Sequence, residues 1–338
     1  MIGVPSLRER FQWRQALLAA PAMIMIIAYG LFTGKVTESA IAAGAALSVG
    51  MVASRSLGYF RWDSVLLVAL GTALTSVLGS LAGESLSLYA LGVFCAAAGV
   101  GMGSLGHPQF WLVYLQLAIA FIVAGHFPSD LSTAMSHSKI VLMGSLTQAA
   151  TIAVIALLLP RLAKTMPPIT PHMGAVSPVV FGLVAGVVVS AALCAAERLG
   201  LSSIYWPAMT ALLLLRPNLV HTQQRVIQRT VGTVAGCFLA FIVVSIAPRE
   251  PAYLAITLMV AFALTFALQP TPRTSYGWFS GAVTTSVLLL LAFARTDIVQ
   301  DAELRLFSTV MGAALAWAGA LFLEYVLAKP DSDATEGI

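Results

Sequence analysis

Two arginines one helical turn apart give the clearest chemical signal in this sequence. Arg225 and Arg229 are four residues apart, so on a helix they project from the same face. A guanidinium group presents a planar fork of N–H donors that suits the two oxygens of a carboxylate. Both arginines would lie at a helix N-terminus, where an anion is favoured. The pair therefore predicts an anion-binding site, although contacts with lipid phosphates at a membrane surface would explain the same residues.

The same helical face continues into two glycines. Gly232 and Gly236 stand three and seven residues after Arg229. A Gly-x-x-x-Gly step lets a second helix approach closely within a bilayer, so we expect these glycines to pack rather than to bind a ligand. We expect the same packing role for Gly71 and Gly312.

A partial repeat of this spacing occurs near the C-terminus. Its residues are Arg305, Thr309, Gly312 and Ala316. One interpretation is an inverted repeat in which one basic residue lies at each end of a transport path. The simpler interpretation, which the sequence favours, is an exposed ion pair between Arg305 and Asp301, and such a pair contributes little to stability.

Polar residues inside apolar runs need an internal partner or a wet cavity. We expect Thr210, Thr233 and Gln148 to offer hydrogen bonds to a bound anion. Tyr205 and Trp206 could stack on an aromatic ligand, but these residue types also concentrate at membrane interfaces.

Other kinds of chemistry find little support in the residues. The three cysteines lie in apolar runs and the five histidines are scattered, so we expect neither a metal site nor a cofactor. No clustered His, Asp, Glu or Cys has catalytic spacing, which argues against an enzyme. Proton coupling would normally need an acid near the bilayer centre. Glu324 is the best candidate, yet an acid near the end of a span can instead reach water.

The composition requires membrane helices to position these residues. Of 338 residues, 59% are hydrophobic and only 9% are charged. Soluble domains carry about 25% charged residues, so a cytosolic globular protein is excluded, as are disordered and fibrous classes. The net charge of +4 is not gathered in a basic domain, so nucleic-acid binding is not expected. What remains is an all-α polytopic membrane protein.

The apolar runs predict about twelve transmembrane helices, because a spanning helix takes about 20 residues. The expected spans are 15–33, 38–54, 64–82, 86–104, 109–125, 139–159, 178–196, 203–216, 226–247, 251–269, 276–294 and 304–327.

The chain divides near its midpoint into two halves of similar pattern. We expect a first six-helix repeat at 1–160, a Pro-rich cytoplasmic linker at 161–177, a second repeat at 178–328 and a cytoplasmic tail at 329–338. A shift of 161 residues superposes Arg55 on Arg216 and Gly71-Thr72 on Gly232-Thr233. An even number of helices in each half gives a parallel duplication. The side that holds most Lys and Arg should be cytoplasmic, and this places both termini there.

One segment resembles the signature of a known family. It reads Tyr205-Trp206-Pro207-Ala208-Met209-Thr210, then Arg216-Pro217, then Arg225-x-x-x-Arg229-x-x-Gly232-Thr233-x-x-Gly236. This is similar to the fusaric acid resistance and aromatic acid exporter superfamily (FUSC), which is related to the aluminium-activated malate transporters of plants. The resemblance implies six-helix units that export organic anions, typically aromatic carboxylates, across a bacterial inner membrane. For many such exporters it also implies a periplasmic adaptor of the membrane-fusion type.

The first half departs from this signature. Ser64 and Val68 occupy the positions that match Arg225 and Arg229. We therefore expect one anion site per chain, or a path shared by the two chains of a homodimer, with lipids and an organic anion as the other partners. An exporter of aromatic or otherwise lipophilic weak acids is the leading hypothesis. A passive anion channel on the same scaffold is the alternative, and a membrane scaffold or enzyme is the third class.

Overall fold

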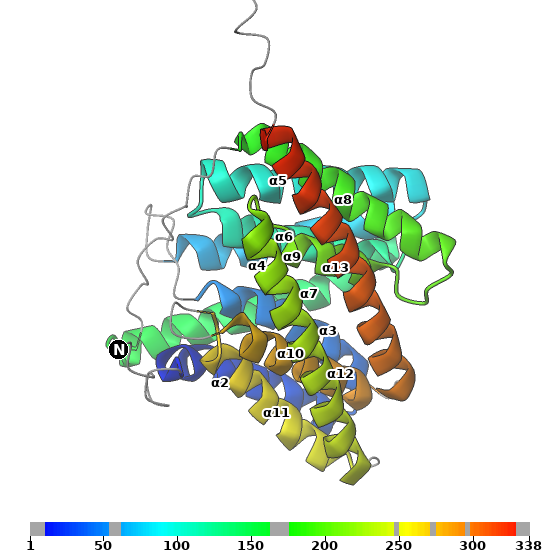
Figure 1. The fold of residues 1–338 in the computed structure, drawn as a ribbon. Helices are drawn as coiled ribbons and strands as arrows, with labels where there is room; N and C mark the ends of the chain where they lie inside the picture. The colour runs from blue at the N-terminus through cyan, green and yellow to red at the C-terminus, as the bar shows by residue number, and fades with distance from the viewer. Residues whose placement is uncertain are drawn as a thin grey trace, which may run out of the picture.

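The computed structural model describes residues 11–53, 62–162, 176–246, 250–270, 275–294 and 298–328 (Figure 1). Within these ranges the secondary structure consists of twelve α-helices and contains no strand. Each of the twelve predicted spans overlaps one of these helices, which confirms the all-α fold class.

The helices are numbered from α2 to α13. Those before the Pro-rich segment are α2 (Trp13–Thr33), α3 (Val36–Met51), α4 (Asp63–Ala82), α5 (Leu86–Gly106), α6 (Trp111–Gly125) and α7 (Leu131–Leu158). Those after it are α8 (Pro178–Arg198), α9 (Tyr205–Leu214), α10 (Leu219–Ile246), α11 (Pro251–Ala267), α12 (Tyr276–Phe293) and α13 (Ile298–Ala328).

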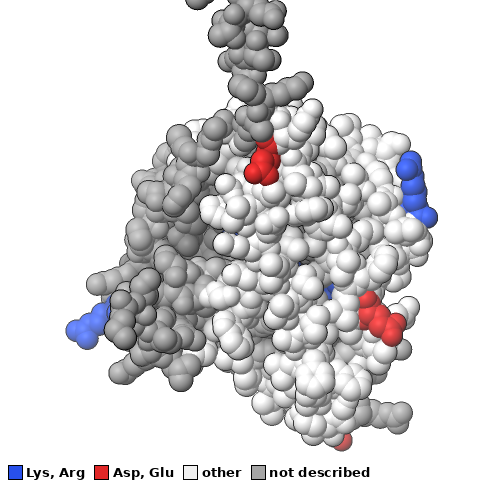
Figure 2. All heavy atoms as spheres, viewed as in Figure 1, with Lys and Arg blue, Asp and Glu red and all other residues white. Residues whose placement is uncertain are grey.

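Eight of these helices are long and apolar enough to cross a membrane. The other four, α3, α6, α9 and α11, are apolar but shorter, with 10 to 17 residues each. Many large hydrophobic side chains lie exposed on the outside, and Figure 2 shows a face almost free of charged side chains among the described residues. Such a surface suits lipid rather than water. The chain is therefore a multi-pass membrane protein with eight candidate spans among its described residues, and the predicted count of twelve spans is not confirmed.

Three helices begin earlier than the apolar runs indicated. α7, α10 and α13 begin at Leu131, Leu219 and Ile298, whereas the sequence predicted starts at 139, 226 and 304. Their first turns are polar, so hydropathy misses them. The Asp130 side chain caps α7 by accepting a hydrogen bond from Ser132 N at 3.2 Å. Capping of this kind begins a helix whatever the polarity of its first turn.

The helices pack in the same pattern in both halves. In the first half, α2 packs on α3 and α7, α3 on α7, α4 on α6 and α7, and α5 on α6. In the second half, α8 packs on α9 and α13, α9 on α13, α10 on α12 and α13, and α11 on α12. The halves meet where α5 packs on α8 and where α2 packs on α11. Both meeting points are visible in Figure 1.

Candidate anion-binding site

α10 positions the first residue of the site. Asn218 Oδ1 accepts a hydrogen bond from His221 N at 3.2 Å in the first turn of this helix. Arg229, about 15 Å further along the helix axis, is only 2% exposed. Its Nε atom has no hydrogen-bond partner among the described residues. The only ion pair in the described parts of the chain joins Lys35 and Glu38, so no described carboxylate compensates Arg229.

α13 contributes a second buried arginine. Arg305 is 3% exposed, its guanidinium carbon lies 4.7 Å from the centre of the Trp206 ring, and its Nε also lacks a partner among the described residues. The interpretation of Arg305 as part of an exposed loop is therefore wrong. Because α13 begins at Ile298, Arg305 lies in its second to third turn, inside the bundle.

Buried hydroxyl groups surround the two arginines. Thr210 of α9, Thr233 of α10 and Ser308 of α13 are almost fully buried, and the hydroxyl of each lacks a hydrogen-bond partner within the described ranges. A buried hydroxyl without a partner costs free energy, so such groups are rare and call for an explanation. Here three of them lie on the same three helices as Trp206, Arg229 and Arg305.

A second basic group lies where α9 joins α10. Arg225 is half-buried, and its guanidinium carbon is 4.5 Å from the centre of the Tyr276 ring. Arg216 lies over Trp111 at 5.4 Å and donates from Nη1 to Leu215 O at 2.7 Å. Burial, followed by the neighbouring Arg225, lowers the pKa of Arg216. Arg216 and Arg225 are stacked on aromatic rings of α6 and α12, whereas Arg305 is stacked on Trp206 of α9.

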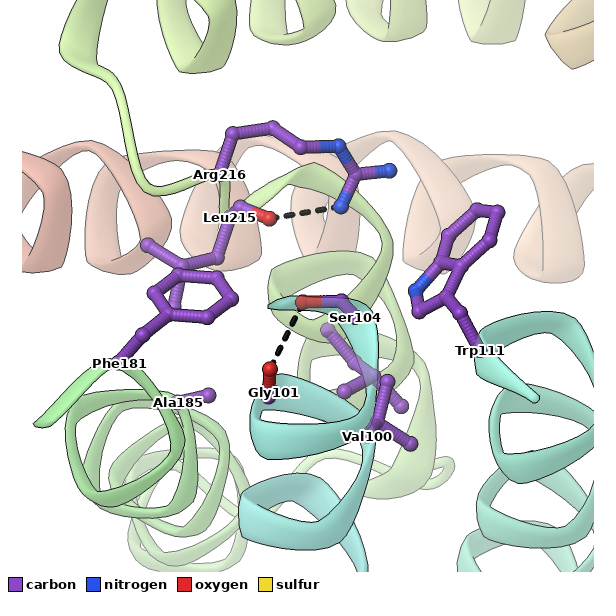
Figure 3. A pocket seen from close by; sticks show the side chains of 9 residues that line it. Val100, Gly101, Ser104, Trp111, Phe181, Ala185, Leu215 and Arg216 are labelled. Atoms are coloured by element: carbon purple, nitrogen blue, oxygen red, sulfur yellow. Dashed lines mark hydrogen bonds between the residues drawn. The ribbon is translucent and has the colours of Figure 1, made fainter. Parts of the chain in front are cut away.

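Arg216 also borders a small depression between the two halves. Figure 3 shows its side chain on one side and Trp111 and Phe181 on others, with Ser104 donating to Gly101 O at 2.7 Å below. The depression has an empty volume of about 270 Å³, part of which is open to solvent. It is separate from the site around Arg229.

The remaining predicted site residues lie elsewhere. Gln148 is buried in α7 and donates to Ala19 O of α2 at 3.0 Å, so it belongs to the first half. Tyr205 lies at the start of α9 with its ring centre 5.1 Å from that of His126. Glu324 is exposed on α13. Trp206 is only 2% exposed, which does not fit the alternative of a membrane-interface residue.

The glycines lie at close helix contacts. A Cβ added at Gly232 would lie 2.5 Å from Gly277 O, and one at Gly236 would lie 2.6 Å from Gly281 O, both in α12. A Cβ at Gly312 would lie 2.6 Å from Pro207 O in α9. These contacts bring α10 against α12, and α13 against α9. They thereby position the helices that carry the buried arginines.

Sequence reasoning missed Ser308 and Tyr276, and it set Arg305 aside in favour of an exposed ion pair. A signal for Arg305 was present, since its spacing to Gly312 repeats the spacing of Arg229 to Gly236. Tyr276 gave no signal, because its neighbour Arg225 lies on another helix, 51 residues earlier in the chain.

His126 gives a pH-dependent stability prediction. It follows α6, and its ring packs on Phe127 and Tyr205. Burial lowers the pKa of His126, with Glu197 acting more weakly in the opposite direction. The folded state therefore favours the neutral ring, so stability should fall as the pH drops below about 6.5, the value for an unfolded histidine. Thermal unfolding in detergent at several pH values should show this loss, and His126→Phe should flatten it. An unchanged pH slope in this variant would contradict the prediction.

Fold and site together define a polytopic membrane protein with buried, uncompensated arginines in its second half. Residues 190–319 match the model of the family described as fusaric acid resistance protein-like. This match confirms the resemblance found in the sequence signature, and it covers the part of the chain that holds Trp206, Arg229 and Arg305. Within a multi-pass membrane protein, this segment is thus similar to the FUSC family of transporter-like membrane proteins.

Two curated proteins are each similar to 40% of this chain. An uncharacterized protein, ORF2, from Neisseria gonorrhoeae is 33% identical over 136 residues, which is 40% of this chain and 32% of that protein. The uncharacterized protein YhfK from Escherichia coli strain K12 is 28% identical over 137 residues, which is 40% of this chain and 19% of that protein. The match therefore spans a third or less of the length of these relatives. No solved structure matches the chain.

Proposed function

We propose that this protein exports organic anions, chiefly aromatic or otherwise lipophilic carboxylates, across a bacterial inner membrane. The observation that carries the proposal is the burial of Arg229 and Arg305, each with an Nε atom that has no hydrogen-bond partner among the described residues. An arginine at the centre of a membrane helix costs about 3 kcal/mol even by the lowest scales. Ionisable residues in such positions generally serve a substrate or ion pathway, and a bound carboxylate would offset the cost.

A passive anion channel on the same scaffold is the alternative. The exposed position of Glu324 favours a channel, because an acid on the surface of the helix bundle is poorly placed to relay protons to the buried arginines. A channel needs no proton relay, since its anions move down their own electrochemical gradient.

The organisation of the chain is also part of the proposal. Two parallel six-helix repeats, at 1–160 and 178–328, are supported by the main helix contacts, which correspond between α2–α7 and α8–α13. Most of the proposed linker 161–177 and all of the tail 329–338 lie outside the described residues. Both termini would be cytoplasmic. A homodimer and a periplasmic adaptor protein are further proposals that rest on the family resemblance.

A flux measurement tests the function. Proteoliposomes loaded with a fluorescent aromatic carboxylate should release it in the presence of the wild-type protein, with a membrane potential and a pH gradient applied separately. Release that follows voltage alone supports the channel, and release that needs the pH gradient supports a coupled exporter. Arg229→Ala should lower the release, whereas Arg198→Ala, at the exposed end of α8, should not. Absence of carboxylate flux under both gradients, with folded protein in the vesicles, would refute the proposal.

A further inference from the structure

Arg229 and Arg305 come from neighbouring helices that run in opposite directions, as the colours of α10 and α13 in Figure 1 show. The contact between Cys237 Sγ of α10 and Ala302 O of α13, 4.0 Å apart, shows which residues of the two helices lie side by side. Arg229 precedes Cys237 by eight residues and Arg305 follows Ala302 by three. The two arginines thus start about 7 Å apart along the helix axes, so two like charges are buried at neighbouring levels of adjacent helices.

The buried hydroxyls lie at about the same heights along the helix axes as the two arginines. Thr233 is one turn beyond Arg229, which places it level with Arg305 by the same register. On α9, Thr210 is one turn beyond Trp206, and its Cβ is 2.7 Å from the position of a Cβ added at Gly312 of α13. Ser308 lies between the levels of Arg305 and Gly312. Two cations and three hydroxyls therefore converge from α9, α10 and α13, and hydroxyl groups can donate to an oxyanion.

Arg225 differs from the pair in its exposure and in its ring contact. Its guanidinium is stacked on Tyr276 of α12, and its side chain is half-buried rather than enclosed. Arg216, another cation, is its electrostatic neighbour. Arg225 is therefore placed to attract anions towards the site rather than to hold one inside it.

We propose that Arg229 and Arg305 jointly bind the carboxylate of the transported anion in one site between α9, α10 and α13. Trp206 acts as a positioning residue, because its ring centre lies 4.7 Å from the Arg305 guanidinium carbon and attracts the cation. This inference rests on the proposed function and names the residues of its binding site, with Arg305 in place of Arg225.

The proposal also implies one such site per chain. By the repeat, Arg229 corresponds to Val68, which is fully buried in an apolar cluster. Gly144 of α7 packs on Ala42 of α3 in the same way as Gly312 of α13 packs on Pro207 of α9. Arg305 lies seven positions before Gly312, and the residue seven positions before Gly144 is His137. His137 is exposed, so the first half has no counterpart of the arginine pair.

Binding of benzoate to the purified full chain in detergent tests the assignment by isothermal titration calorimetry. Wild-type protein should bind one benzoate per chain. Arg229→Ala and Arg305→Ala should each weaken binding by about 10- to 150-fold, the range for losing a hydrogen bond to a charged group. The double variant should bind little worse than either single variant, because both residues serve one ligand. Arg225→Ala removes only an attracting charge outside the site, so it should weaken binding less than either of these variants, and His137→Ala should change the affinity by less than about threefold.

Two further variants separate binding from folding. Arg305→Lys keeps the charge but loses the planar fork, so it should fold and still bind benzoate more weakly than wild type. Trp206→Phe should retain more affinity than Trp206→Leu, since only the former keeps a ring beneath the guanidinium.

The outcomes distinguish the two levels of the proposal. If wild type binds benzoate and Arg225→Ala, rather than Arg305→Ala, abolishes binding, the arginine pair is misassigned while the proposed function stands. If two benzoates bind per chain, the single site is refuted. If folded wild-type protein binds no benzoate or other aromatic carboxylate, the proposed function fails together with the site.

Discussion

Replacing Arg229 with methionine is expected to raise the melting temperature of the protein in anion-free buffer and, at the same time, to abolish carboxylate transport. Arg229 is 2% exposed and forms no ion pair with a described carboxylate, so its buried charge destabilises the folded state. Methionine fills much of the same volume without a charge or a polar atom. The gain should approach the cost of about 3 kcal/mol for an arginine inside a membrane helix.

Thermal unfolding in detergent, with and without benzoate, measures both halves of this prediction. Ligand that binds only the folded state stabilises it, so benzoate should raise the melting temperature of wild type and leave that of Arg229→Met unchanged. Arg198→Met, at the exposed end of α8, is the matched control and should behave like wild type. A lower melting temperature for Arg229→Met would mean that the arginine is a structural residue, and would argue against the anion site.

The sequence predicted a helix at each of the twelve positions and put Arg225 and Arg229 on one helix face, whereas the structure gives the two side chains different exposure and different contacts. A step of four residues rotates a helix face by about 40°. On a surface helix this difference is small, but in a crowded bundle it decides which neighbour a side chain meets. Arg225 meets Tyr276 of α12, whereas Arg229 lies near Arg305 of α13.

Arg305 itself could not be placed without the tertiary structure. Its ring partner Trp206 is 99 residues away in the chain, and no periodicity links positions so distant. Hydropathy also starts α13 too late, because the polar residues around Asp301 precede the apolar run. Arg305 therefore looked like a residue at a helix end. Gln148 shows a further limit of the sequence. A polar residue in an apolar run is expected to be buried, but the sequence does not show that its side chain donates to Ala19 O of α2.

Introducing leucine at Gly236 is expected to destabilise the protein by roughly 1–3 kcal/mol, the usual range for overpacking a tight interface. A Cβ there would lie 2.6 Å from Gly281 O and 2.8 Å from the Cβ of Thr284. The nearest atom belongs to the backbone of α12, which cannot rotate aside as a flexible side chain can. The helices must therefore separate. Thermal unfolding in detergent measures the loss.

Gly99→Leu is the matched control, because a Cβ at Gly99 of α5 has no atom within 4 Å outside its own helix segment. This variant should unfold like wild type. Gly236→Leu should in addition weaken benzoate binding, since Thr233 and Arg229 lie on the helix that is pushed away from α12 and towards α13. A normal melting temperature for Gly236→Leu would show that α10 and α12 do not approach as closely as the contact between Gly236 and Gly281 requires. Normal stability together with normal binding would show that the contact between Gly236 and α12 does not position the arginines.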